Sequence, residues 1–166
     1  STHRCLWRTK MTLKFRVEHD SFGDLLVPIN ALYGAQTQRA VQNFTISGQQ
    51  MPAEFIQALA MIKASVANAN VELGHLNKGQ AKAIEKAALE IVNGKHWNQF
   101  PIDVFQTGSG TSSNMNVNEV IAHLAQSNNK VKVHPNDHVN LGQSSNDVVP
   151  SAILLSSLRM VKVELL

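Results

Sequence analysis

The sequence has little of several features that define other classes of protein. Its single cysteine, Cys5, excludes an internal disulfide and favours a reducing compartment. No apolar run approaches the roughly 18 residues of a membrane span, and the chain shows no signal-peptide core. We therefore expect a soluble protein of the cytoplasm, with the mitochondrion as the alternative, and no membrane partner.

Aromatic residues and charge are also scarce, at 5% and 16% of the chain. The net charge of +3 arises at the amino terminus, because five basic residues precede the first acid, Glu18. No basic stripe with interleaved aromatic residues follows, which argues against nucleic acid as a partner.

Clusters with the spacing of metal ligands are missing as well. His134 and His138 are four residues apart, but Pro135 between them is expected to break the helix that a paired metal site needs. His96 has no second ligand at a useful spacing. We expect no metal and no organic cofactor.

Helical patterns account for most of what is present. Hydrophobic residues make up 43% of the chain and are mainly Ala, Val, Leu and Ile, which favours closely packed helices. One helix is expected over Glu54–Leu73, a second between a cap at Asn77 and a stop at Gly94, and a third over Asp147–Leu166. The predicted buried stripes are Phe55, Leu59, Ile62, Val66, Ala69 and Leu73 in the first helix, and Ala81, Ile84, Ala88 and Ile91 in the second.

The amino-terminal part is less regular. Residues 16–28 read as strands with a turn at Gly23-Asp24, and residues 30–44 contain a short helical pattern. The polar cluster Gln36-Thr37-Gln38-Arg39 fits a solvated helix face, although Arg39 is also suited to meet an anion.

A glycine-containing loop that runs into a helix is the most informative stretch. In residues 106–125, QTGSGTSSNMNVNEVIAHLA, apolar residues at Val117, Val120, Ile121 and Leu124 have helical spacing. Ahead of them, glycines and hydroxyl side chains adjoin the unpaired N–H groups of the helix start, and no acid occurs between residues 103 and 119. This is typical of an anion site, although helix capping alone also explains it.

A second copy of the arrangement strengthens the anion reading. Gln143-Ser144-Ser145-Asn146-Asp147 again places hydroxyl and amide groups before a long apolar helix. Two such helix starts suggest a ligand with more than one anionic group.

These segments carry a resemblance. QTGSGTSSNMNVNEV, HPNDHVN, GQSSNDVVPSA and VPINALYGAQTQRAVQNF resemble the amino-terminal portion of class II fumarate hydratases of the fumarase/aspartase superfamily, from about Phe15 onward. The resemblance implies a mainly α fold, with a leading extension at 1–14, an amino-terminal helical domain at 15–141 and the start of a central helical-bundle domain at 142–166.

The activity implied by the resemblance is the reversible addition of water to fumarate, giving L-malate in the tricarboxylic acid cycle. It also implies a homotetramer that uses no metal or organic cofactor. Aspartate ammonia-lyases share part of the motifs and are the alternative within enzymes. A truncated helical binding or assembly module is the alternative outside them.

The resemblance assigns roles to particular residues. The carboxylate-binding residues would be Ser109, Thr111, Ser144, Ser145 and Asn146. His134, Asn136 and Asp137 match a segment that the family uses for a second, peripheral dicarboxylate site. Val131 stands where that segment usually has a basic residue, and Leu141-Gly142 replaces a commoner Lys-Ser, so this second assignment is weaker.

The family's catalytic segments, a Thr-His pair and a serine loop, have no match within residues 1–166. We therefore assign no catalytic residue and expect the chain alone to be inactive, since removing a proton next to a carboxylate needs a base and strong stabilisation of the anion formed.

Overall fold

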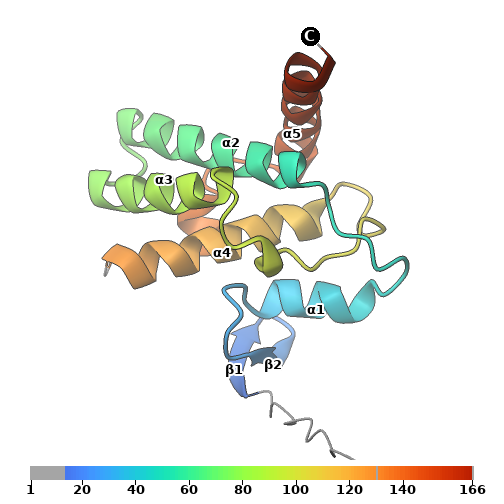
Figure 1. Ribbon diagram of the computed structural model, residues 1–166. Coiled ribbons are helices and arrows are strands. Elements are labelled where there is room, and N and C mark those ends of the chain that lie inside the picture. Colours follow the sequence, from blue (N-terminus) through green and yellow to red (C-terminus); the bar gives the residue numbers. More distant parts are fainter. Residues whose placement is uncertain (1–13, 130, 166) are drawn as a thin grey trace, which may run out of the picture.

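The computed structural model describes residues 14–129 and 131–165, so Cys5 and the predicted extension, apart from Lys14, lie outside the described residues. The chain is mainly helical, as predicted, and a small hairpin and α1 lie beside the larger helices (Figure 1). The elements in order are β1 (Phe15–Asp20), β2 (Gly23–Pro28), α1 (Ala35–Asn43), α2 (Ala53–Glu72), α3 (Lys78–Val92), the 3-10 turn η1 (Trp97–Gln99), α4 (Thr111–Asn129), the π-helical turn η2 (Pro135–Val139), α5 (Ser145–Met160) and the π-helical turn η3 (Val161–Leu165).

β1 and β2 form an antiparallel hairpin in which Phe15 pairs with Pro28 and Asp20 with Gly23. The turn consists of Ser21 and Phe22, so the predicted turn at Gly23-Asp24 is wrong by two residues. Gly23 is instead the first residue of β2, and its φ of 109° is readily available only to glycine. The backbone N–H of Phe22 donates to Asp20 Oδ1 over 2.8 Å, which closes the turn at its earlier position.

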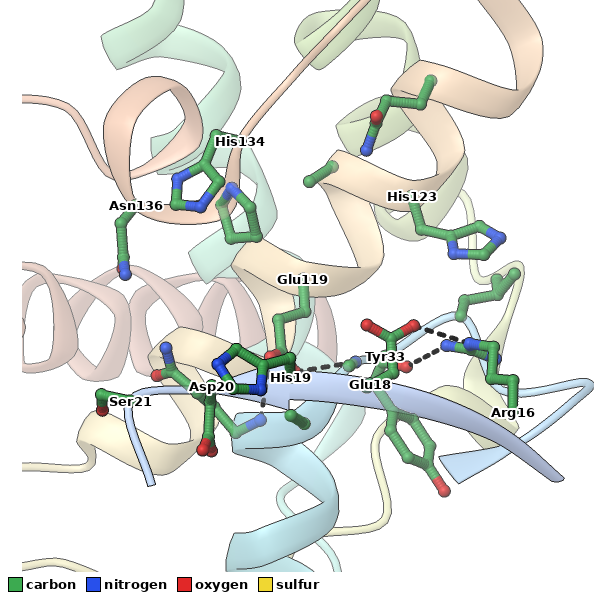
Figure 2. Close-up of a pocket in the computed structure, with 17 residues that line it drawn as sticks. Arg16, Glu18, His19, Asp20, Ser21, Tyr33, Glu119, His123, His134 and Asn136 are labelled. Carbon is green, nitrogen blue, oxygen red and sulfur yellow. Dashed lines mark hydrogen bonds and ion pairs between the residues drawn. The ribbon is translucent and has the colours of Figure 1, made fainter. Parts of the chain in front are cut away.

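Glu119 of α4 caps the start of α1, as the close-up in Figure 2 shows from the side of the hairpin. Its carboxylate accepts hydrogen bonds from the backbone N–H groups of Gly34, Gln36 and Thr37, at 2.9–3.1 Å. The Thr37 hydroxyl donates to the same carboxylate over 2.5 Å. The expectation of a solvated face is therefore wrong for Thr37, which is fully buried because it bridges α1 and α4.

The two arginines near the hairpin are already paired. Arg39 donates to both carboxylate oxygens of Asp20, over 3.0 and 2.9 Å. Arg16 donates to Glu18 and to backbone carbonyls at Pro28, Ala31 and Tyr33. Arg39 therefore serves to join α1 to the hairpin, rather than to meet an external anion.

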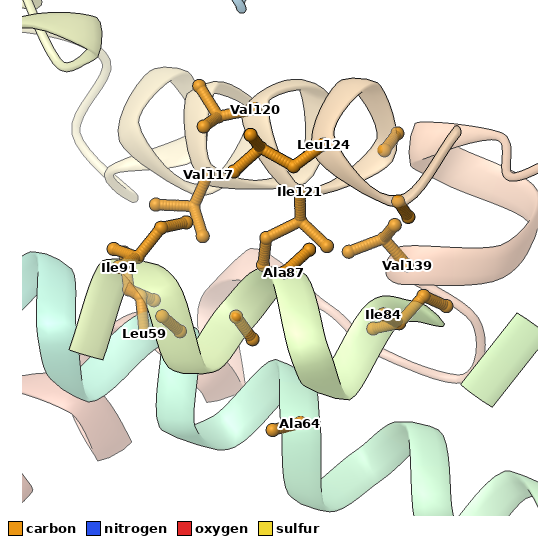
Figure 3. Packing of buried hydrophobic residues seen from close by; sticks show 14 of the residues in the cluster. Leu59, Ala64, Ile84, Ala87, Ile91, Val117, Val120, Ile121, Leu124 and Val139 are labelled. Carbon is orange, nitrogen blue, oxygen red and sulfur yellow. The ribbon is translucent and has the colours of Figure 1, made fainter. Parts of the chain in front are cut away.

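The hydrophobic core lies between α2, α3 and α4, where Leu59, Ile84, Ile91 and Ile121 pack together (Figure 3). Every residue of the predicted stripe on α3 is buried, as are the four apolar residues predicted to line α4. The predicted cap at Asn77 is confirmed: its side-chain oxygen accepts from Gln80 N over 2.8 Å. Local periodicity thus describes α3 and α4 well.

The buried face of α2 differs from the prediction. Leu73 is 67% exposed and Ala69 is exposed, whereas Lys63 and Asn70 are buried. α2 is apolar around much of its circumference, so its periodicity selects no single face. Its alanines allow close approach to α3, and its two buried polar residues face the segment at Asn140–Gln143.

α5 packs against α2, and its carboxyl-terminal part projects from the other helices (Figure 1). Val148, Val149 and Ala152 are buried, but Leu154 is 72% exposed and Val163 is 81% exposed. Of the helices in the described part of the chain, none combines the length and the apolar character of a membrane span.

Candidate functional site

The structure brings the two predicted helix starts together through Gly110. This glycine has a φ of 67°, and a Cβ atom added to it would lie 2.9 Å from Cγ1 of Val149, in the second turn of α5. A side chain at position 110 would therefore separate the start of α4 from the first turns of α5. The glycine is needed for both its backbone conformation and this close approach.

At the start of α4, the cap comes from Gln106 rather than from a serine or threonine. Its side chain accepts from Ser113 N over 2.9 Å and donates to Ser113 Oγ over 2.9 Å. Ser109 Oγ and Thr111 Oγ1 lie 2.8 Å apart near the surface. Because Gln106 supplies the cap, neither hydroxyl is needed for capping, and the hydrogen bond between them leaves one O–H donor for a ligand.

Backbone donors adjoin these hydroxyls. Within residues 14–129 and 131–165, the N–H groups of Thr111 and Ser112 have no protein acceptor. They lie at the positive end of the α4 dipole, which favours a carboxylate at this position.

At the start of α5, Ser144 acts as the N-cap, and its hydroxyl accepts from Asn146 N over 3.3 Å. Capping is thus at least part of its role. Ser145 is half-buried and Asn146 is exposed, so both side chains can reach a ligand. Asp147 in the same turn is exposed and stabilises the helix dipole, but its charge opposes a bound anion.

Asp103 anchors the segment that leads into the glycine loop. The carboxylate is buried and accepts from Ser47 N, Gly48 N and Phe105 N, at 2.6–2.9 Å, and from the Ser47 hydroxyl. Burial raises the pKa of Asp103, but these hydrogen bonds outweigh it and hold the pKa well below its usual range.

Sequence reasoning missed Lys63, whose amine donates hydrogen bonds to Asn140 and Gln143, just before the start of α5. Its side chain is fully buried in α2, and Nζ donates to Asn140 Oδ1 over 2.9 Å and to Gln143 Oε1 over 2.8 Å. Burial lowers the pKa of Lys63 to about 7. One signal for it was available: Lys63 lies four residues from both Leu59 and Ala67, within an apolar stripe.

His134 and Asn136 line a separate cavity of about 490 Å³ between the hairpin, α4 and η2 (Figure 2). Its wall includes the carboxyl groups of Glu18, Asp20 and Glu119. The lining arginine, Arg16, is held by Glu18 and backbone carbonyls.

His19 and His123 also line this cavity, and His123 adds little positive charge. Desolvation first, and then Arg16, lower the pKa of His123. The lining thus contains three acidic residues and one arginine, and this balance of charge opposes a dicarboxylate. The peripheral dicarboxylate site remains a prediction, and the electrostatics of the cavity count against it.

The turn η2 corrects the expectation about Pro135. This proline is the first residue of the short helical turn instead of breaking it, because a proline at that position loses no helical hydrogen bond. Inside the turn, His134 N donates to His138 Nδ1 over 2.7 Å, and Asp137 Oδ2 lies 3.2 Å from His134 Nδ1. Among the residues with a described placement, no three His, Cys, Asp or Glu side chains are grouped to hold a metal.

Comparison with known proteins assigns this arrangement to a family. Residues 23–166 match the family described as Lyase, and the chain belongs to that family. Among its relatives are proteins named fumarate hydratase class II. This chain is 61% identical to the fumarate hydratase class II from Xylella fastidiosa over 153 residues, and the match covers 92% of this chain and 32% of the relative. This chain is 58% identical to the fumarate hydratase class II from Corynebacterium glutamicum, and the match covers 84% of this chain and 29% of the relative.

Solved structures agree with the sequence comparison. The class II fumarase from Schistosoma mansoni superposes with a TM-score of 0.85 at 44% identity, covering 89% of this chain and 33% of that one. A fumarate lyase:delta crystallin from Brucella melitensis gives a TM-score of 0.86 at 42% identity, covering 90% and 34%. The chain spans about a third of the length of these relatives.

Proposed function

We propose that the starts of α4 and α5 form part of the dicarboxylate site of a fumarate hydratase, which adds water reversibly to fumarate and gives L-malate. The observation that carries the proposal is the contact between Gly110 and Val149, which brings two donor-rich helix starts to one place. Ser109 and Thr111 contribute from one side, and Ser145 and Asn146 from the other. The names of the relatives supply the reaction.

The chemistry of the site supports binding of a carboxylate. Hydroxyl, amide and backbone N–H groups donate to anions, and donors at a helix start gain from the helix dipole. The same side chains are weak bases at neutral pH. We therefore propose that this chain binds the substrate and that the base acts from another segment of the complete enzyme. The chain by itself is then expected to bind fumarate without hydrating it.

A chimaeric protein tests the proposed reaction. Residues 15–166 of this chain would replace the matched third of the Xylella fastidiosa relative, and hydration would be followed by the loss of fumarate's ultraviolet absorbance. We expect hydration at a rate near that of the unaltered relative. Release of ammonia from aspartate without hydration of fumarate would favour an ammonia-lyase instead. A folded chimaera without either activity would favour a binding or assembly module.

Two single substitutions in the chimaera test the site. Because each charge-assisted hydrogen bond to a carboxylate is worth about 1.5–3 kcal/mol, Thr111→Ala or Asn146→Ala should lower kcat/KM roughly ten- to a hundredfold. If both loops bind one dicarboxylate, the double substitution should depart from additivity.

Asn77→Ala is the matched control, because Asn77 caps α3 without belonging to the site. It should destabilise the protein by about 1 kcal/mol and leave kcat/KM unchanged. If Thr111→Ala and Asn146→Ala behave in the same way, the two helix starts are caps, and the binding proposal is wrong.

A further inference from the structure

Lys63 is a buried basic residue whose partners lie on the segment that leads into α5. Its side chain is 0% exposed, and both of its described hydrogen bonds go to amide oxygens, those of Asn140 and Gln143. A lysine is almost never fully buried unless its amine is paired, because desolvation of the charged form is unfavourable, so these two hydrogen bonds matter to the local structure.

Gln143 transfers this contact to the start of α5. It directly precedes the N-cap Ser144, and its side chain is held at both ends: Oε1 accepts from Lys63 Nζ over 2.8 Å, and Nε2 donates to Val139 O over 2.9 Å. Its backbone N–H donates to Asn140 O over 3.1 Å. The position of Ser144 therefore depends on the position of Gln143.

Asn140 connects the same amine to α4. Its Oδ1 atom accepts from Lys63 Nζ over 2.9 Å, from Asn114 Nδ2 over 3.1 Å and from Asn118 Nδ2 over 3.2 Å. Asn114 lies one helical turn beyond Gly110, whose carbonyl accepts from its N–H. Lys63 is thus linked to the start of α5 through Gln143 and to the start of α4 through Asn140 and Asn114.

The network is short of donors. The Oδ1 atoms of Asn114 and Asn118 are buried without a partner among the described residues. Loss of the Lys63 amine would add Gln143 Oε1 to these unsatisfied acceptors. A buried acceptor without a donor favours local rearrangement, so the segment at Gln143 is expected to move if the amine is removed.

We propose that Lys63 is a positioning residue, which holds the starts of α4 and α5 in the relative placement that lets them bind one dicarboxylate. The part of this inference that concerns the dicarboxylate rests on the function proposed above. The part that concerns the placement of the helix starts stands on the hydrogen bonds alone. A neutral amine retains two N–H groups for its two acceptors, so the role is the same whether or not Lys63 is charged.

The test uses the full chain with two separate variants. Lys63→Met removes the amine and keeps a long apolar side chain, whereas Gln143→Met removes the acceptor Oε1, together with the donor Nε2, without altering α2. Amide hydrogen exchange would be measured by NMR at Asp147 and Val148, whose N–H groups donate to Ser144 O over 3.1 and 3.0 Å. We expect exchange at these amides to become about tenfold faster in both variants, with protection in α3 unchanged. Fumarate, titrated by the same method, should bind about tenfold more weakly.

Asn70→Ala is the matched control. Asn70 is also buried in α2, and it donates to Leu141 O over 3.1 Å, close to the same segment but with no bond to Gln143. It should leave exchange at Asp147 and Val148 unchanged. An equal increase in all three variants, or no increase in Lys63→Met and Gln143→Met, would overturn the proposal. Absence of fumarate binding to the unaltered chain would contradict the proposed function, and the exchange rates would still decide the role of Lys63.

Discussion

At the scale of single residues, two buried charged side chains have opposite surroundings. Glu119 meets three backbone N–H groups and a hydroxyl, all of which donate hydrogen bonds to it. Lys63 meets two neutral amide oxygens and no described carboxylate. The donors around Glu119 replace hydrogen bonds that its carboxylate would make with water, whereas burial without an opposite charge disfavours the charged form of Lys63.

The depressed pKa of Lys63 makes stability depend on pH. The pKa is about 7 in the folded chain and 10.5 for an unperturbed lysine, so the unfolded state binds more protons between these values. The free energy of unfolding should therefore rise as pH increases from about 7 towards 10.5, by at most about 1.4 kcal/mol per pH unit from this group. Urea unfolding at pH values from about 6.5 to about 9.5 would measure this rise.

Lys63→Met supplies the comparison for this prediction, because it removes the titrating group and leaves the other ionisable residues in place. The rise with pH should be smaller in the variant than in the unaltered chain. Identical pH dependences would mean that Lys63 keeps its proton in the folded state as readily as in the unfolded one.

Glu119→Gln should destabilise the chain. The substitution turns one acceptor into an N–H₂ group that faces backbone N–H donors at the start of α1, so we expect a loss of about 2–4 kcal/mol in the free energy of unfolding. Chemical denaturation would measure it. Glu72→Gln, at an exposed position, is the control and should change stability by less than about 0.5 kcal/mol. Equal effects of the two substitutions would contradict the capping role.

At the scale of elements, the close approach of α4 and α5 depends on the absence of a side chain at residue 110. Gly110→Ala should combine the strain of a positive φ, about 1–2 kcal/mol, with a clash against Val149 of about 1–3 kcal/mol. Both effects lower the melting temperature, and calorimetry would measure them.

Two further variants separate these contributions. Gly94 has a similar φ of 79°, but a Cβ atom added there would meet open space, so Gly94→Ala should show the effect of strain alone. Combining Gly110→Ala with Val149→Ala should relieve the clash. If Gly110→Ala destabilises no more than Gly94→Ala, the packing of α4 against α5 is looser than the structure indicates.

At the scale of the whole molecule, α5 exposes a large apolar surface. Ile153, Leu154 and Leu158 are 50%, 72% and 52% exposed. Unburied side chains of this size each leave about 1.5–3 kcal/mol of burial unrealised, and contiguous patches of them favour association. A homotetramer, as the resemblance implies, is one assembly that would cover this surface, and it stays a prediction.

We expect the chain to associate with itself in a concentration-dependent way, as sedimentation velocity would show. Leu154→Glu should reduce this association. Leu73→Glu is the control, because Leu73 is similarly exposed, at 67%, but lies at the end of α2. Association that both substitutions weaken equally, or a monomer at every concentration, would contradict a role for α5.

Much of the architecture followed from local sequence patterns. The periodicity of α3 and α4, the cap at Asn77 and the strand character near the amino terminus involve residues close together in the chain, so side-chain chemistry and spacing predict them. Both helix starts of the candidate site were also visible in this way, because glycines, hydroxyls and amides ahead of an apolar helix form a local signal. The motifs further indicated the family, which the comparisons confirm.

Tertiary structure alone decided which of these features meet and which side chains support them. The bond from Lys63 to Gln143 joins residues 80 positions apart, and that from Thr37 to Glu119 joins residues 82 apart. No local periodicity encodes such pairs. α2, apolar around much of its circumference, therefore showed its buried face only once packed, and Glu119, Lys63 and the close contact at Gly110 acquired their roles from partners that folding brings near.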